Sequence, residues 1–422
     1  GLPQSAMVEF AELLHGAKNA VFVWSMGITQ HHHGGDGVSA VLNLGLAMGY
    51  VGRPKNGLMP IRGHSSVQGG AEMGCYSTAL PGGKPVTPEN CAALAAQYGF
   101  PIPCWPGLSA VEMVEAGGRG QLDVLYCLGG NFLRTLPDPD SVARAMENIP
   151  VRVHQDIVLT DQMFLEPREE VLLLPARTRY EQDDGGTETS TERRVMFTPE
   201  IPRLVGEARA EWKILRELAA ATWPERAHLL GCETGWALRE EIARVVPFYD
   251  GIQHLRKTGD AFQYGGERLG DGGRFATADG RAHFKVVEVP AGRGGRPASA
   301  GGLGAEPGGA HPTPPPRFVV STRRGKQFNT LIYAERDPLT GADRDAVFLS
   351  EADARALALQ EGDPVVLTSD TGRYEGRAFL APLAPGNLQV HWPEGNVLIP
   401  TGVTDPVGGV PDYNATVTLA RR

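Results

Sequence analysis

The most informative stretch of this sequence, residues 25–74, reads SMGITQHHHGGDGVSAVLNLGLAMGYVGRPKNGLMPIRGHSSVQGGAEMG. An apolar run at residues 19–26 leads into it and suits a buried parallel strand, and residues 38–50 suit a buried helix. The loops beside these elements are polar and rich in glycine, Gly27 among them. Open α/β sheets bind their ligands in loops at the carboxyl ends of strands. The stretch therefore predicts an α/β fold with a ligand site in these loops.

Four polar side chains of this stretch are candidates for hydrogen bonding to a ligand: Gln30, Arg62, His64 and Gln68. Arg62 lies in a Pro-Ile-Arg-Gly-His loop, where a guanidinium would hold a small carboxylate or oxyanion by paired, charge-assisted contacts. A surface salt bridge is the alternative for this arginine. The three consecutive histidines at 31–33 suggest a metal, but side chains of neighbouring residues diverge. We expect a loop of the substrate funnel there.

The α/β pattern continues to about residue 199. Short apolar strands are expected at 123–128, 151–153 and 171–174, with a helix at 141–148 between the first two. Strands that alternate with helices favour a layered, mostly parallel sheet. Apolar residues at helical spacing then predict helices at 211–221 and 238–246.

The pattern of the sequence changes near the carboxyl end. Residues 291–316 contain almost no bulky apolar side chain and are predicted to form a flexible linker. Beyond it, short strands are expected at 318–323, 347–350, 364–369, 374–380 and 388–392, with a small helix at 352–359. Regular short strands separated by turns indicate a compact β-barrel.

Composition excludes several classes of protein. The net charge of -9 is spread without long runs of one sign, which argues against a nucleic-acid partner. No apolar run is long enough for a membrane segment and no signal peptide is recognisable, so we expect a cytoplasmic protein. The five cysteines include no CxxC pair and predict buried single thiols, with no iron–sulfur or zinc signature.

The motifs of residues 26–30, 52–54 and 60–69 together resemble the catalytic subunits of formate dehydrogenases, and most closely their less characterised relatives implicated in acid resistance. The resemblance implies that Met26, Gly27, Gln30 and Gln68 approach a molybdopterin cofactor and its metal. It makes Arg62 the substrate-side arginine. Two positions after this arginine, formate dehydrogenases resemble one another in having a glutamine, whereas this chain has His64. The imidazole of His64 could relay a proton.

Two strand-end loops extend the resemblance. The Leu-Gly-Gly-Asn loop at 128–131 is similar to the family's pterin-guanine contact loop, which assigns Gly129 and Asn131 to the cofactor. The motif at 154–161 is similar to another strand end of the family, which implies that Gln155, Asp156 and Asp161 meet the nucleotide part. Taken alone, each is also compatible with an ordinary strand-end loop. The loop at 185–194 resembles a third contact region, with Ser190 and Arg193 in place of the usual Asn and Gly.

Three loops of the expected barrel resemble the family's molybdopterin-dinucleotide-binding domain, and solvated turns are the alternative for each. The implied cofactor contacts are Thr322, Arg324, Gln327, Asn329, Trp392, Asn396, Tyr413 and Asn414. The family's barrel is of the double-psi type. The fold class expected is therefore α/β, with layered, mostly parallel sheets in partial domains, followed by a small double-psi-type β-barrel.

The resemblance covers only the carboxy-terminal half of the family's pattern. It implies a remnant of one α/β molybdopterin domain at 1–64, the second half of another at 65–225, a mostly helical connection at 226–290, the linker at 291–316 and the barrel at 317–422. No metal ligand is expected in this chain, and a 4Fe-4S cluster is expected only in the missing amino-terminal part.

The function implied is that of part of a molybdenum or tungsten bis(molybdopterin guanine dinucleotide) oxidoreductase, formate-dehydrogenase-like and acting on a small molecule. The expected partner is the missing half or a partner subunit, without which the chain would be inactive. A non-catalytic scaffold that keeps the fold is the alternative.

Overall fold

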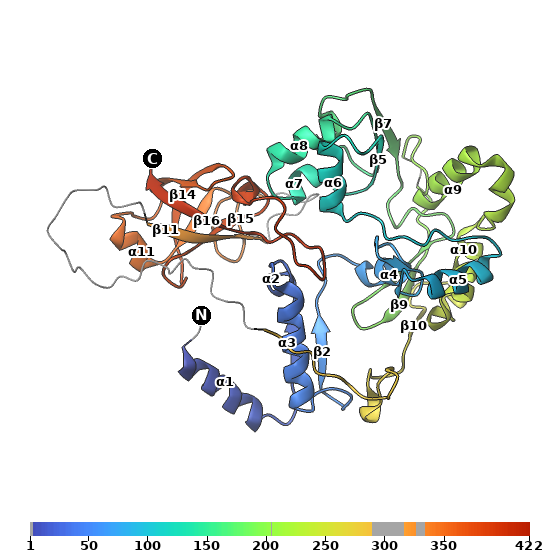
Figure 1. Ribbon diagram of the computed structural model, residues 1–422, viewed down its shortest axis with the longest axis horizontal. Coiled ribbons are helices and arrows are strands. Elements are labelled where there is room, and N and C mark those ends of the chain that lie inside the picture. Colours follow the sequence, from blue (N-terminus) through green and yellow to red (C-terminus); the bar gives the residue numbers. More distant parts are fainter. Residues whose placement is uncertain (1–2, 204, 289–315, 326–333) are drawn as a thin grey trace.

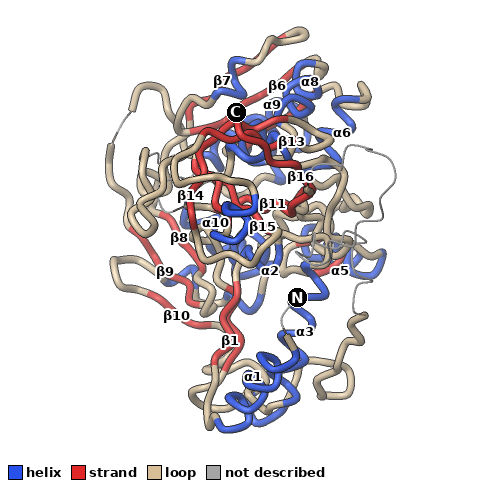
Figure 2. The backbone as a smooth tube through the Cα atoms, turned by 90° about the vertical axis from the view of Figure 1, so that its left-hand side faces the viewer, coloured by secondary structure: helices blue, strands red, loops and turns tan. Residues whose placement is uncertain are grey.

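A computed structural model describes residues 3–203, 205–288, 316–325 and 334–422. The predicted linker lies almost entirely outside these residues, as do Gln327 and Asn329. The chain forms three parts with helices and strands, and a carboxy-terminal barrel (Figure 1). In a perpendicular view, α1 and β1 lie at the opposite end of the molecule from β6 and β7 (Figure 2).

The first part is a helical layer beside a two-stranded sheet. Its elements are α1 (Gln4–Gly16), β1 (Val21–Trp24), α2 (Met26–Thr29), α3 (Gly34–Ala47) and β2 (Gly57–Pro60). β1 pairs with β2 in parallel, with Val21 opposite Gly57, so both strands end beside the loops at 25–33 and 61–66. Tyr50 is buried and its hydroxyl donates to the main-chain oxygen of Leu14 at 2.7 Å, which fixes α1 to the end of α3.

The helix expected at 38–50 differs from the prediction in extent and in burial. α3 begins at Gly34 and ends at Ala47, and only Gly34 and Gly45 in it are buried. Two strands cannot cover a helix of this length, and Val21 and Val23 of β1 are 47% and 55% exposed. This part therefore presents uncovered apolar surface.

The second part is a parallel three-stranded sheet in the order β5-β6-β7. Its elements are α6 (Ala110–Gly118), β5 (Val124–Leu128), α7 (Phe132–Thr135), α8 (Pro139–Glu147), β6 (Val151–Asp156), η1 (Asp161–Phe164) and β7 (Glu170–Pro175). The helices α6 and α8 bury Leu125, Cys127, Val142, Met146 and Ile149 on one face. The strands predicted here are confirmed, and β6 is longer than expected.

A third part joins residues on both sides of this sheet. Its elements are α4 (Val67–Glu72), β3 (Ala79–Leu80), β4 (Lys84–Pro85), α5 (Pro88–Tyr98), β8 (Gly186–Thr189), β9 (Arg194–Thr198), α9 (Glu211–Thr222), η2 (Pro224–Leu229), α10 (Gly235–Val245), η3 (Pro247–Tyr249), η4 (Ile252–His254), β10 (Ala261–Gln263) and η5 (Asp271–Gly273). Antiparallel pairing joins β8 to β9 and β9 to β10. Within residues 226–288, α10 is the one longer helix and β10 extends the hairpin, so these residues contain less helix than predicted.

The carboxy-terminal part is a closed six-stranded barrel in the order β11-β15-β12-β14-β13-β16. Its elements are β11 (Arg317–Arg323), β12 (Ala346–Leu349), α11 (Glu351–Ala356), β13 (Pro364–Thr368), β14 (Arg373–Leu380), β15 (Asn387–His391), η6 (Glu394–Leu398) and β16 (Asn414–Arg421). Alternating side chains such as Phe318 and Val320 fill the interior. The sequence patterns predicted five of these strands and missed β16, which pairs with both β11 and β13.

Candidate functional site

A cavity of about 410 Å³ lies where the loop after β2 meets the β8–β9 hairpin. Arg62, His64 and Gln68 line it from one side, and Glu188 to Glu192 line it from the other. The two sides lie far apart in the sequence and meet because α4 packs beside β8. Three residues predicted to serve substrate and cofactor are thereby brought together.

The guanidinium of Arg62 is half-buried in this cavity and has no acidic partner among the described residues. Its Nη1 donates to the main-chain oxygen of Pro60 at 3.1 Å and to Thr191 Oγ1 at 3.4 Å. Two glutamates, Glu188 and Glu192, line the cavity, and Glu188 is paired instead with Arg179. The salt-bridge alternative for Arg62 is therefore not seen, and its charge is available to an anion.

Met26 and His64 flank the arginine. A side-chain carbon placed on Gly63 would lie 3.7 Å from Met26 Sδ, so the thioether packs against the loop that carries Arg62. His64 is exposed on the rim of the cavity. Solvent can therefore reach the imidazole, as a group that exchanges protons requires.

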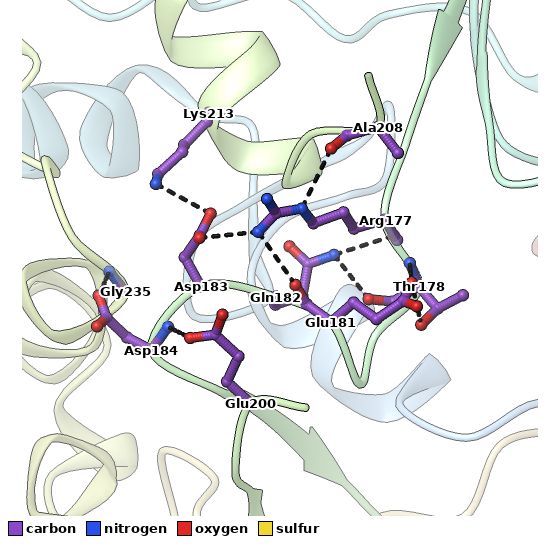
Figure 3. A network of polar contacts seen from close by, with 10 residues as sticks. All are labelled: Arg177, Thr178, Glu181, Gln182, Asp183, Asp184, Glu200, Ala208, Lys213 and Gly235. Atoms are coloured by element: carbon purple, nitrogen blue, oxygen red, sulfur yellow. Dashed lines mark hydrogen bonds and ion pairs between the residues drawn. The ribbon is translucent and has the colours of Figure 1, made fainter. Parts of the chain in front are cut away.

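A polar network holds the chain that leads into the β8–β9 hairpin (Figure 3). Arg177 Nη1 donates to Asp183 Oδ1 at 2.8 Å, and Lys213 of α9 reaches the other carboxylate oxygen at 2.9 Å. Partial burial opposes the charge on Asp183, but the two cations outweigh it and lower the pKa of this carboxyl. Asp184 accepts from the main-chain nitrogen of Gly235 at 2.9 Å, which ties the loop to α10. These contacts hold in place the residues that precede the β8–β9 hairpin, and the hairpin contacts Arg62 through Thr191.

A second polar region lies between α7 and the barrel. The main-chain φ angles of Gly129 and Gly130 are +67° and +78°, and no atom lies within 4 Å of a side-chain carbon built on either. Asn131 is buried, caps α7 and donates from Nδ2 to Asp161 Oδ1 at 2.7 Å. Gly129, Asn131 and Asp161 therefore form one loop cluster, as the sequence predicts, with open space over the glycines.

The barrel contributes Asn396 and Tyr413 to this region. Asn396 Nδ2 donates to the main-chain oxygen of Arg134 at 2.9 Å, and the Tyr413 hydroxyl donates to that of Thr135 at 2.6 Å. Asn396 Oδ1 is buried and accepts no hydrogen bond within the part of the chain that the structure describes. A buried acceptor without a donor is costly, so this atom suits a donor supplied from outside the chain.

Arg324 and Trp392 stack at the same end of the barrel. The guanidinium carbon of Arg324 lies 4.1 Å from the centre of the Trp392 ring, and the arginine is exposed whereas the tryptophan is buried. Thr322 lies nearby on β11, with its methyl group 3.0 Å from the position of a side-chain carbon on Gly395. An exposed, oriented guanidinium of this kind can bind a phosphate.

The loop at 30–33 joins the first part of the chain to the barrel. Asn414 Nδ2 lies 3.1 Å from His31 Nδ1, and the main-chain nitrogen of Tyr413 donates to the oxygen of Gln30 at 3.5 Å. His32 Nδ1 lies 2.8 Å from the oxygen of Thr404, while His33 faces Asp36 at 4.0 Å. The rings of His32 and His33 meet edge to face with their centres 4.8 Å apart, whereas His31 bonds to Gly27 and Asn414, and no group of ligands suited to a metal occurs among the described residues.

The side chains of Gln155 and Asp156 bond outside these clusters, although the main-chain oxygen of Gln155 accepts from the nitrogen of Gly129 at 2.8 Å. Gln155 is buried, accepts from the Tyr126 hydroxyl at 2.5 Å and donates to the oxygen of Glu211 at 3.5 Å. Asp156 accepts from the main-chain nitrogen of Ile157 at 2.7 Å. Sequence analysis missed Glu72, Tyr249 and Tyr264, which form hydrogen bonds behind the cavity; no local motif marks them, because they lie far apart in the chain.

The two regions fit a pterin dinucleotide by the chemistry of their donors and acceptors. Glycines with open space admit a ligand close to the backbone, amides can read the edges of a pterin or guanine, and Arg324 can neutralise a pyrophosphate.

No helix long and apolar enough to cross a membrane occurs in the described residues.

The chain is similar to several known proteins. YdeP of Escherichia coli is 29% identical over 437 residues, which cover 98% of this chain and 54% of YdeP. YjgC of Bacillus subtilis is 32% identical over 266 residues, 61% of this chain and 25% of YjgC. Among solved structures, acetylene hydratase from Pelobacter acetylenicus matches 80% of this chain and 51% of its own, at 14% identity and a TM-score of 0.49.

The chain thus spans about half the length of YdeP. Residues 318–417 match the molybdopterin dinucleotide-binding domain. Residues 4–221, more than half of the chain, match the molybdopterin oxidoreductase family. The chain belongs to the molybdopterin oxidoreductase family.

Proposed function

We propose that this chain is the carboxy-terminal part of a molybdenum or tungsten bis(molybdopterin guanine dinucleotide) oxidoreductase that oxidises or reduces a small oxyanion by two electrons, as formate dehydrogenases do. The observation that carries the proposal is Arg62, a half-buried guanidinium in a cavity of about 410 Å³, with no acidic partner in the part of the chain that the structure describes. A cation held in this way favours a small anion by charge-assisted hydrogen bonds.

The chain's own residues would divide the work between substrate and cofactor. Arg62 would bind and orient the oxyanion, and His64 on the rim would exchange a proton with solvent. Asn131, Asn396 and Arg324 would hold the pterin dinucleotide between α7 and the barrel. When bound, the cofactor would supply the two-electron redox chemistry, and the protein binding, orientation and electrostatics.

The proposed partner is the amino-terminal half of the same type of protein, as a longer chain or a separate subunit. Val124 and Leu128 of β5 and Leu172 of β7 are 55%, 51% and 40% exposed on the face of the sheet opposite the one that the helices cover. Exposed sheet faces of this size are normally covered. We propose that the missing half covers them, carries the iron–sulfur cluster and the metal ligand, and is required for turnover.

The test is steady-state turnover of the complete protein with formate and other small oxyanions, with an artificial electron acceptor. Arg62→Ala is expected to lower kcat/KM about a hundredfold or more while molybdenum or tungsten content stays at the wild-type level. Arg226→Ala, which removes an exposed arginine of η2, is the matched control and should leave turnover unchanged. Unchanged turnover in Arg62→Ala would remove the arginine from the proposal, and a wild type without metal would favour a scaffold.

A further inference from the structure

Glu72, the last residue of α4, accepts three hydrogen bonds directly behind the Arg62 cavity. The Tyr249 hydroxyl lies 2.6 Å from Glu72 Oε2, and the Tyr264 hydroxyl and the Gln68 amide nitrogen both reach Glu72 Oε1. Gln68 lines the cavity, whereas neither tyrosine does. Glu72 is therefore linked to the candidate site through one cavity residue of its own helix.

The directions of these hydrogen bonds follow from the chemistry of the groups. A carboxylate only accepts, so each tyrosine spends its single hydrogen on Glu72. Thr189 Oγ1 lies 2.6 Å from the Tyr249 oxygen and must then donate to it. Burial first, and the hydrogen bond to Glu72 second, raise the pKa of Tyr249 and of Tyr264 above the ordinary range of tyrosine, so both remain donors at neutral pH.

The same constraint fixes the amide of Gln68. Its Nε2 must face Glu72, since an amide oxygen there would meet another acceptor. Gln68 Oε1 is left to the cavity side, and it accepts no hydrogen bond within the described residues. The cavity thus offers a carbonyl acceptor from Gln68 and a cationic donor from Arg62.

The network is packed tightly enough to hold this orientation. Tyr249 and Thr189 are buried, and the rings of Tyr249 and Tyr264 stack with their centres 5.3 Å apart. A side-chain carbon on Gly69 would lie 3.0 Å from both Thr189 Oγ1 and Ser66 Oγ, so α4 approaches β8 as closely as a glycine permits. This packing fixes the Glu72 carboxylate, and the hydrogen bond to it fixes which end of the Gln68 amide faces it, because an amide can turn over without needing more room.

We propose that Glu72 is a positioning residue, which orients the Gln68 amide so that its carbonyl oxygen accepts a hydrogen bond from an N–H group of the bound pterin. A pterin is an aminopyrimidinone and carries such donors on its ring edge. The inference rests on the proposed function, because it requires the pterin to reach this cavity.

The experiment is a four-variant cycle in the complete protein: wild type, Glu72→Gln, Gln68→Ala and both changes together. The readouts are the pterin retained per polypeptide after a fixed wash, measured by fluorescence, and the melting temperature. In Glu72→Gln the new amide can present an N–H to Gln68, whose amide can then turn its nitrogen toward the pterin. Loss of the hydrogen bond and the unpaired group left behind should lower retention about tenfold.

The cycle separates positioning from folding. If Glu72 acts through Gln68, adding Glu72→Gln to Gln68→Ala causes no further loss of pterin, because the carbonyl is already absent. Equal losses in both backgrounds, or no loss in either, would overturn the inference while leaving the proposed function intact. A wild-type protein without pterin would overturn both.

Two further variants complete the experiment, one as a substitute for Glu72→Gln and one as a control. If Glu72→Gln does not accumulate in folded form, Tyr264→Phe removes one partner of the network and keeps the carboxylate. It should lower retention about threefold, and only when Gln68 is present. Glu207→Gln replaces an exposed glutamate by the same chemistry and should match wild type in both readouts.

Discussion

The hydroxyl of Tyr413, at the start of the last barrel strand, donates a hydrogen bond to the main-chain oxygen of Thr135 in α7 at 2.6 Å. Burial raises the pKa of Tyr413 to about 12, so the hydroxyl remains a donor over the whole neutral range. The bond spans 278 residues of sequence and joins two of the loops predicted to bind the cofactor. This hydrogen bond therefore holds α7 against the barrel.

Removal of this bond should weaken the boundary. Tyr413→Phe leaves the Thr135 oxygen without its buried donor and is expected to lower the free energy of unfolding by about 1–2 kcal/mol. Hydrogen exchange at residues 132–136 should become faster in the same variant. Tyr76→Phe, at a tyrosine whose side chain is 56% exposed, is the control. Equal exchange rates in Tyr413→Phe and wild type would show that the bond does not hold α7.

Arg324 offers a direct probe of the barrel side of the site. Arg324→Ala should lower the pterin dinucleotide retained per polypeptide about tenfold, because it removes the exposed charge above Trp392. Arg324→Lys should retain an amount of pterin dinucleotide between those of Arg324→Ala and the wild type, since the charge remains and the planar stacking is lost. Arg317→Ala changes an exposed arginine at the other end of β11 and should have no effect. A loss as large in Arg317→Ala would indicate a general charge effect.

Gly69 and Gly70 give a matched pair on one short helix. Gly69→Ala would place a methyl group 3.0 Å from Thr189 Oγ1 and Ser66 Oγ, whereas no atom lies within 4 Å of the corresponding position on Gly70. We expect Gly69→Ala to destabilise the protein by about 1–3 kcal/mol and Gly70→Ala to be neutral or slightly stabilising. Thermal unfolding of the two variants checks this. Equal melting temperatures would mean that α4 and β8 separate easily.

Two buried histidines make stability depend on pH. Burial lowers the pKa of His154 in β6 and of His391 in β15 to about 4, and neighbouring arginines add to the effect. The unfolded chain, with an ordinary histidine pKa near 6.5, binds more protons below that pH. The stabilisation is thus complete above about pH 6.5 and is lost as pH falls toward 4, by on the order of 2–3 kcal/mol for each histidine.

Denaturant unfolding at pH 7.5, 6 and 5 measures this slope. His154→Gln removes one titrating group and should flatten the dependence, whereas His254→Gln, at an exposed histidine, should leave it unchanged. A wild-type stability that stays constant over this range would contradict the assignment of both histidines as neutral, buried groups.

The sequence predicted the parts of the fold whose patterns are local. The strands β5 and β7 are largely apolar runs, β6 begins with Val151 and Val153, and turns separate the short barrel strands, so local patterns identified them. It missed β16, because that strand closes the barrel by pairing with two strands far away in sequence. It overestimated the burial of α3, since periodicity assumes a covering layer that these residues do not include.

The site was predicted where motifs are contiguous. Arg62, His64 and Gln68 share one short stretch, and the structure places all three around one cavity. Glu72 and Tyr249 lie 177 residues apart, and only the packing of η3 against α4 brings them together. Gln155 was assigned to the cofactor from its place at a strand end; its side chain accepts a hydrogen bond from Tyr126, and the assignment stays a prediction.

The proposed function requires that this chain and the proposed amino-terminal half together hold a pterin. The most direct test is the molybdenum, tungsten and pterin content of the complete protein purified from its native host under adequate metal supply. We predict metal and pterin dinucleotide in stoichiometric amounts, with pterin lost from the Arg324→Ala variant. A folded, full-length protein that contains neither metal nor pterin would contradict the account.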